Sequence, residues 1–106
     1  MEKEYELIVA VVSKGQSDVV VGAAREAGAT GGTIMYGKGT FNSDNDAFLG
    51  INLKAEKEII FTIVPTSKKT KIMEQISSKA GLSEEGKGIL FSLPINSMIG
   101  TKKDNK

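Results

Sequence analysis

The segment Glu6–Val12, "ELIVAVV", decides the fold that we expect for this chain of 106 residues. Its residues are mostly β-branched or aliphatic, a composition that favours a buried β-strand. Alternate residues of a strand point to opposite faces, and both sets are apolar here: Leu7, Val9 and Val11 against Ile8, Ala10 and Val12. A strand with one solvated face would carry polar residues at every second position. The segment therefore predicts a strand that is covered on both faces.

The residues that follow predict a helix and a second strand. Ser17 is a candidate N-cap, Asp18 follows it in the first turn, and Gly28 is a natural left-handed stop. Four apolar residues between these ends share one helical face: Val20, Ala23, Ala24 and Ala27. The next strand is expected around Thr33–Tyr36. The first half of the chain is thus predicted to be a βαβ unit.

The second half repeats this order. Glu58–Val64, "EIIFTIV", predicts a buried strand, and Gly88–Ile95, "GILFSLPI", predicts the last one. The helix between them has Thr66 or Ser67 as its cap and ends at Gly81. Two βαβ units in succession predict an α+β, ferredoxin-like split βαβ–βαβ sandwich. Its antiparallel four-stranded sheet would carry both helices on one face, so the apolar second face predicts self-association.

A long segment separates the two halves. Residues 41–55, "FNSDNDAFLGINLKA", begin with polar turn formers and then carry a small apolar cluster around Phe48. A loop of this length in a compact domain is more often functional than idle. We expect residues 1–100 to form a single domain that contains this loop, and residues 101–106, "TKKDNK", to be a disordered tail.

The composition excludes several classes of function. The chain has no Cys and no His, which removes thiolate and imidazole catalysis and ordinary zinc sites. With a net charge of +1 and Arg25 as the single arginine, no nucleic-acid partner is expected. The charged start "MEKEYE" is unlike a signal peptide, and the longest apolar run is too short to cross a bilayer. We therefore predict a cytoplasmic protein with no catalytic residues and no metal site.

The stretch Gly31–Thr40, "GGTIMYGKGT", looks at first like a phosphate-binding loop. A P-loop needs a Ser or Thr after its lysine, but Gly39 follows Lys38. Its four spacer residues also favour a strand over a turn. Two interpretations of the glycines remain open: they end helices and form turns, or they let a phosphate approach bare backbone N–H groups.

Three features together resemble the PII signalling family. They are "AGATGGTIMYGKGT" (27–40), the loop 41–55 after it, and "EEGKGILFSLPI" (84–95), which is similar to the family's B-loop and last strand. The resemblance covers roughly residues 6–99 and implies a trimer of ferredoxin-like subunits. It implies a non-enzymatic signal-transduction protein, active in nitrogen regulation, that binds an adenine nucleotide (ATP, ADP or AMP) in clefts between subunits. It would regulate a membrane transporter or a metabolic enzyme through loop 41–55, the family's T-loop, with no tightly bound cofactor.

The resemblance also implies the site residues by position. Those that match the nucleotide cleft are Gly31, Gly32, Thr33, Lys38, Gly39, Thr40, Lys57, Gly86, Lys87 and Gly88. Those that match the partner-binding loop are Phe48, Leu49 and Gly50.

The chain departs from the family pattern in its ligand residues. No glutamine follows Gly39, and Phe61 stands where the family usually has a glutamate, which argues against sensing of 2-oxoglutarate with magnesium. The paired arginines near the C-terminus are replaced by lysines, so fewer phosphates or another anion would fit. Two alternatives on the same fold are a trimeric ion-tolerance protein of the CutA type and a small acyl-phosphate hydrolase. The hydrolase would depend on Arg25, which we expect in mid-helix with no glycine loop around it.

Overall fold

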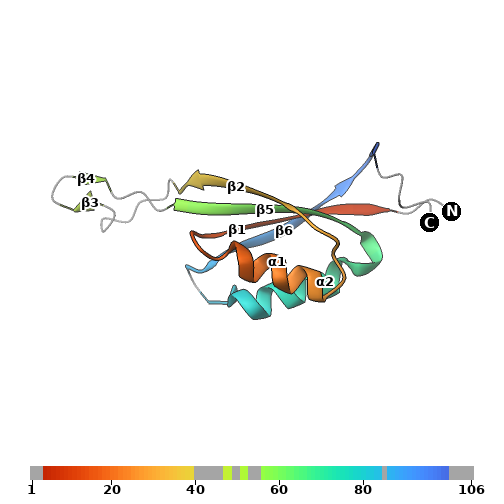
Figure 1. Ribbon diagram of the computed structural model, residues 1–106, viewed down its shortest axis with the longest axis horizontal. Coiled ribbons are helices and arrows are strands. Elements are labelled where there is room, and N and C mark those ends of the chain that lie inside the picture. The colour runs from red at the N-terminus through yellow and green to blue at the C-terminus, as the bar shows by residue number, and fades with distance from the viewer. Residues whose placement is uncertain (1–3, 40–46, 49–50, 53–55, 85, 101–106) are drawn as a thin grey trace.

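The computed structural model describes residues 4–39, 47–48, 51–52, 56–84 and 86–100 (Figure 1). Its elements in chain order are β1 (Tyr5–Ser13), α1 (Ser17–Glu26), β2 (Thr33–Lys38), β3 (Ala47–Phe48), β4 (Ile51–Asn52), β5 (Glu56–Pro65), α2 (Thr66–Ala80) and β6 (Gly88–Ile95). The four longer strands form one antiparallel sheet in the order β2–β5–β1–β6. Both helices pack against one face of this sheet (Figure 1). The predicted α+β, ferredoxin-like fold is confirmed.

The strand limits differ from the predictions by one or two residues, except for β6, which is as predicted. Most of the added residues continue the ladder at the end of the sheet where β2 ends and β5 begins, and Tyr5 and Pro65 extend it at the other end. Ser13 lies opposite Lys57, and Lys38 lies opposite Glu56. The apolar pattern did not include these pairs because they bury little apolar surface and are held by cross-strand pairing.

The core lies between the helices and the covered face of the sheet. One set of alternate residues from each central strand meets the apolar stripes of α1 and α2 there. The buried aliphatic residues with the least exposure are Ile8, Ala10, Val12, Val20, Ile60, Val64, Ile72 and Ile76. Full burial of each larger aliphatic side chain is worth about 1.5–3 kcal/mol, so this layer supplies most of the subunit's own hydrophobic stabilisation.

The start of α1 corrects the capping prediction. Ser17 is the first helical residue, and no side chain caps the helix from the preceding position, Gln16. Instead, the backbone N–H of Ser17 donates to Oε1 of Glu58 at 2.8 Å. Glu58 belongs to β5 and is 6% exposed. A carboxylate from a distant strand thus takes the place of a local cap and also suits the positive end of the helix dipole.

The structure confirms the predicted C-terminal end of α2 but not its predicted N-cap. The residue before the helix is Pro65, and no side chain caps this end, so the predicted Thr66 or Ser67 cap is wrong. At the other end Gly81 adopts the left-handed conformation with φ +67°. The N–H of Leu82 donates to the carbonyl of Ser77 at 3.0 Å, which is the Schellman hydrogen bond.

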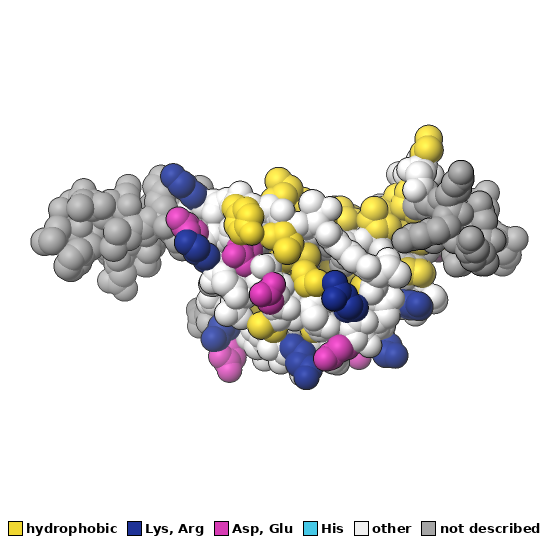
Figure 2. Space-filling model, in the orientation of Figure 1, with side chains coloured by type: hydrophobic (Ala, Val, Ile, Leu, Met, Phe, Trp, Pro, Cys, Tyr) yellow, Lys and Arg dark blue, Asp and Glu magenta, His cyan; other side chains and the backbone are white. Residues whose placement is uncertain are grey.

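The second face of the sheet carries no helix. Large apolar side chains on this face are strongly exposed: Met35 46%, Ile63 46%, Ile89 57%, Phe91 39% and Leu93 49%. We call these five residues the open face. Apolar side chains gather along the upper side of the molecule, where the sheet lies (Figure 2). A contiguous apolar surface of this kind is typical of an interface.

Candidate functional site

Several candidate residues meet at one end of the sheet. Lys38 ends β2, Lys57 lies one residue inside β5, and Gly88 begins β6 opposite Val12 of β1. Gly39 follows Lys38 directly. The register therefore brings the ends of loop 41–55 and the segment 86–88 to the same end of the sheet.

Three of the proposed nucleotide residues lie elsewhere in the subunit. Gly31 and Gly32 precede β2, and Thr33 lies opposite Phe61 at the start of that strand. Thr33 is five residues from Lys38, or about 17 Å along a strand. A single subunit thus does not bring the two groups together, and one ligand would contact both only if different subunits supplied them.

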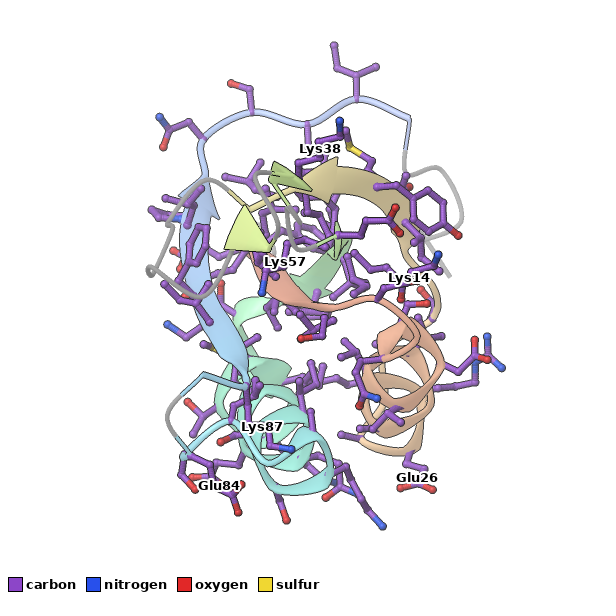
Figure 3. All side chains as sticks on the ribbon, turned by 90° about the vertical axis from the view of Figure 1, so that its left-hand side faces the viewer. Lys14, Glu26, Lys38, Lys57, Glu84 and Lys87 are labelled. Atoms are coloured by element: carbon purple, nitrogen blue, oxygen red, sulfur yellow. The ribbon has the colours of Figure 1, made fainter. Side chains whose placement is uncertain are left out.

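An open pocket of about 380 Å³ lies between the ends of β2 and β5. We call it the lysine pocket; its lining residues are Lys14, Tyr36, Gly37, Lys38, Glu56 and Lys57. Three lysines face one carboxylate, which leaves an excess of positive charge. In Figure 3, Lys14, Lys38 and Lys57 surround the end of the sheet that faces the viewer, from the β1–α1 turn, β2 and β5. This arrangement suits a small anion.

The carboxylate of the lysine pocket is paired with one of its lysines. Nζ of Lys14 lies 2.9 Å from Oε1 of Glu56, with the two side chains 71% and 58% exposed. The hydrogen bond to Glu56, helped by its negative charge, raises the pKa of Lys14 above its ordinary value. The backbone is joined separately, since the N–H of Lys14 donates to the carbonyl of Glu56 at 3.2 Å.

A second carboxylate lies behind this pair. Glu58 is two residues further along β5 and holds the start of α1. The pKa of Glu58 is held below its ordinary value, chiefly by a hydrogen bond from the backbone of Gly15, then by hydrogen bonds from Ser17 and the charge of Lys14. The turn that carries Lys14 is therefore fixed to β5 by Glu58 independently of the Lys14–Glu56 ion pair.

The structure assigns a packing role to two of the candidate glycines. A Cβ on Gly32 would lie 2.7 Å from the carbonyl oxygen of Phe61. A Cβ on Gly88 would lie 2.6 Å from the carbonyl oxygen of Val11, and Gly88 also has φ +147°. Both positions need glycine for close approach of the backbone to a neighbouring strand. Their occurrence is explained without any ligand.

Two other glycines have no such role within the subunit. A Cβ on Gly31 would meet nothing within 4 Å, and one on Gly37 would only touch Cδ1 of Ile59 at 3.5 Å. Neither residue has a positive φ. The hydroxyl of Thr62 donates a hydrogen bond to the carbonyl of Gly31. Gly31 and Gly37 therefore remain positions at which a ligand or a second subunit explains the missing side chain.

Lys87 lies apart from the lysine pocket. Its N–H donates to the carbonyl of Glu84 at 3.3 Å, and the preceding residue, Gly86, has φ +85°. Lys87 is drawn on the helix side of the sheet and Lys38 and Lys57 above it (Figure 3). It is exposed and is not among the residues that line the pocket.

Arg25 requires a correction. It lies in the last turn of α1 and not in mid-helix, and it lines a small pocket together with Gly31 and Gly32. The pocket has about 10 Å³, which is room for roughly one water molecule. Its other lining residues are mostly aliphatic. A glycine segment does lie beside Arg25, but the pocket is far too small for an acyl phosphate.

Part of loop 41–55 is described as a hairpin. Phe48 of β3 pairs with Ile51 of β4, and the pair lies beyond the ends of β2 and β5 (Figure 1). The predicted site residues Thr40, Leu49 and Gly50, and the tail 101–106, lie outside the described residues. Among the residues that are described, no group of three or more Asp, Glu, His or Cys side chains is placed to hold a metal ion. Within the same part of the chain, no helix is long and apolar enough to span a membrane.

The sequence-based prediction missed four residues of the lysine pocket: Lys14, Tyr36, Gly37 and Glu56. Lys14 and Glu56 sit just outside the apolar runs from which the strands were predicted. Only the antiparallel register, continued past each run, places Lys14 beside Glu56 and Glu56 opposite Lys38.

Comparison with known proteins bears on the fold and the family of this chain. A family model described as nitrogen regulatory protein P-II matches residues 5–105. Among solved structures, the crystal structure of Arabidopsis thaliana PII bound to citrate is similar, with a TM-score of 0.72 and 19% sequence identity. The match covers 95% of this chain and 83% of that one. A search of curated protein sequences finds no significant match. The match to the family model over almost the whole chain shows that this protein belongs to the nitrogen regulatory protein P-II family.

Proposed function

We propose that this PII-like regulatory protein binds a small anionic effector, an adenine nucleotide, and signals its presence through loop 41–55. The observation that carries the proposal is the lysine pocket, which lies between the two strands that lead into and out of this loop. An anion held there contacts the root of the loop directly. Binding can shift the loop only if the anion has a different affinity for its two poses.

The chemistry of the pocket supports an anion of modest charge. Within the described part of the chain, Lys38 and Lys57 form no ion pair, while Lys14 is paired with Glu56. The Arabidopsis relative is bound to citrate, a small polyanion. We propose ATP, ADP or AMP as the effector because of the family, and the glycine segment 31–33 of a neighbouring subunit as the second wall of the cleft.

The open face supports assembly into a homotrimer. Its apolar side chains need a cover, and a second copy of the same sheet provides one without a new partner. The register leaves Gly31–Thr33 too far from Lys38 for one small ligand within a subunit. An intersubunit cleft removes this separation. The target of the loop is proposed to be a membrane transporter or a metabolic enzyme, contacted through Phe48, Leu49 and Gly50.

Calorimetric titration tests the effector. The wild-type protein is titrated with AMP, ADP, ATP and citrate, in parallel with Lys38→Gln and with Lys71→Gln, which removes an exposed lysine on α2. We expect micromolar binding of at least one nucleotide, weakened about tenfold or more by Lys38→Gln and left unchanged by Lys71→Gln. Equal affinity in all three proteins would reject the pocket, and absence of nucleotide binding would reject nucleotide sensing.

The same titrations separate a regulator from an enzyme. We expect no phosphate release during hours of incubation with ATP, because the chain has no His or Cys and Arg25 lines only a water-sized pocket. Steady phosphate release that Arg25→Ala abolishes would support the hydrolase alternative. Among the described residues, no arrangement favours the ion-tolerance alternative.

A further inference from the structure

We propose that Glu56 is a built-in competitor in the lysine pocket, displaced from Lys14 when a small polyanion binds. This inference rests on the proposed anion binding at the same pocket and names the device that couples it to loop 41–55. In the structure, Oε1 of Glu56 is 2.9 Å from Nζ of Lys14, so a carboxylate already occupies part of the site. An incoming phosphate or carboxylate group would use the same lysine.

The ion pair is free to exchange because the fold does not depend on it. Both side chains are more than half exposed, and exposed ion pairs contribute little to stability. The backbone hydrogen bond from Lys14 to Glu56 holds the strand ends together regardless of the two side chains. Glu58 fixes the neighbouring turn and the start of α1. Displacing the Glu56 side chain therefore leaves the backbone of the pocket in place.

Glu56 also has a second partner within reach. Lys38 lies directly opposite Glu56 in the β2–β5 ladder. Side chains of directly opposed strand residues start about 4.5–5.5 Å apart at Cβ, close enough for an ion pair. Glu56 can thus pair with Lys14 across β1–β5 or with Lys38 across β2–β5. These two pairings form a bistable element of the kind that a ligand can bias.

The position of this element links it to the loop. Lys38 is the last residue of β2 and Glu56 is the first residue of β5, so loop 41–55 leaves and returns at these two residues. When Glu56 exchanges Lys14 for Lys38, the new ion pair joins the two residues at which the loop leaves and returns. By linkage, whatever favours the second pairing also raises the affinity for the anion.

The test compares anion affinity with and without the competing carboxylate. Wild type, Glu56→Gln, Lys14→Gln and the double variant are titrated with inorganic pyrophosphate and, separately, with citrate. Glu74→Gln, on the exposed side of α2, makes the same charge change outside the pocket. The two anions distinguish a phosphate site from a carboxylate site.

We expect Glu56→Gln to tighten binding by about fivefold or more, within the usual range of coupling between sites, and Glu74→Gln to change it less than twofold. Lys14→Gln should weaken binding, and in its background the effect of Glu56→Gln should largely disappear, since the two act as a pair. Unchanged or weaker binding by Glu56→Gln, with normal binding by wild type, overturns the competitor while the proposed function stands. No binding of either anion by any variant overturns both.

A reporter on the loop tests the coupling. The chain has no Cys, so Ala47→Cys in β3 can be labelled at one position with a fluorophore. We expect pyrophosphate or citrate to change the anisotropy of the label. Glu56→Gln, which lacks the carboxylate for the second pairing, should reduce this change, whereas Glu74→Gln should leave it intact. A label that responds to the anion equally in wild type and Glu56→Gln contradicts the inference.

Discussion

Both faces of the sheet carry large apolar side chains, but only one face is covered by the helices. On the covered face, Ile8 and Val64 are 1% and 0% exposed under the helices. On the open face, Ile63 and Leu93 are 46% and 49% exposed, although they lie on the same or a neighbouring strand. The difference teaches that one subunit satisfies only half of its apolar pattern. The covered face specifies the subunit, and the open face leaves its apolar side chains uncovered within that subunit.

The largest effect is expected from a charge placed on the open face. Phe91→Asp should abolish self-association, because an aspartate would be buried without a partner at the interface. The isolated subunit should remain folded, since position 91 is exposed within it. Light scattering during size-exclusion chromatography measures the mass, and circular dichroism measures the fold. A variant that keeps the wild-type mass would show that the open face is not the interface.

Removing a buried side chain between the helices and the covered face should instead destabilise the subunit itself. Ile72 is fully buried, and Ile72→Ala should lower the free energy of unfolding by about 2–5 kcal/mol. The matched change on the open face, Ile63→Ala, should have a much smaller effect on the subunit itself. Urea denaturation at several protein concentrations separates the two, because only loss at the interface depends on concentration. Equal losses at high dilution would contradict the division between the faces.

The sequence predicted the fold because each strand carries its own signal. A run of β-branched residues such as Glu6–Val12 indicates a strand without knowledge of its neighbours. The apolar second face of this run also indicated that a cover is needed. Glycine at position 81 predicted the end of α2 because the left-handed stop is a local property.

The start of α1 and the lysine pocket could not be predicted in the same way. The group that holds Ser17 is Glu58, 41 residues away in the sequence. Lys14 and Glu56 become neighbours only through the pairing of β1 with β5. Such contacts depend on the register of the sheet, which a list of apolar runs does not contain. The resemblance to PII proteins did supply Lys38 and Lys57, which the structure places in the same pocket.

Substitutions at two glycines test the same difference between the faces, with smaller expected effects. Gly88→Ala should cost about 1–3 kcal/mol or more, because its φ is +147° and a Cβ would lie 2.6 Å from the carbonyl oxygen of Val11. Gly37→Ala should leave the subunit's stability nearly unchanged, since its Cβ would only contact Ile59. If Gly37→Ala nevertheless weakens anion binding or assembly, its glycine serves the ligand or the neighbouring subunit. Thermal unfolding and the calorimetric titration give the two readouts.

The smallest effect concerns Glu58, a buried carboxylate on the covered face. The pKa of Glu58 is lowered from its ordinary value of 4.5, first by the hydrogen bond from Gly15. The stabilisation that the Glu58 carboxylate gives to the fold is therefore complete above about pH 4.5. It is lost as the pH falls through the lower pKa of the folded state. Unfolding followed between pH 3 and 7, roughly the range in which carboxylates titrate, should show a steeper acid loss for wild type than for Glu58→Gln.

Glu58→Ala separates the charge from the hydrogen bond. Glutamine keeps an oxygen that can accept from the Ser17 N–H, whereas alanine removes the acceptor and leaves the first turn of α1 without its cap. Glu58→Ala should therefore lower the melting temperature at neutral pH more than Glu58→Gln does. Identical melting temperatures for the two variants would mean that the charge alone matters. In that case Glu58 would hold the start of α1 by the attraction of its charge to the positive end of the helix dipole, and not by the hydrogen bond to Ser17.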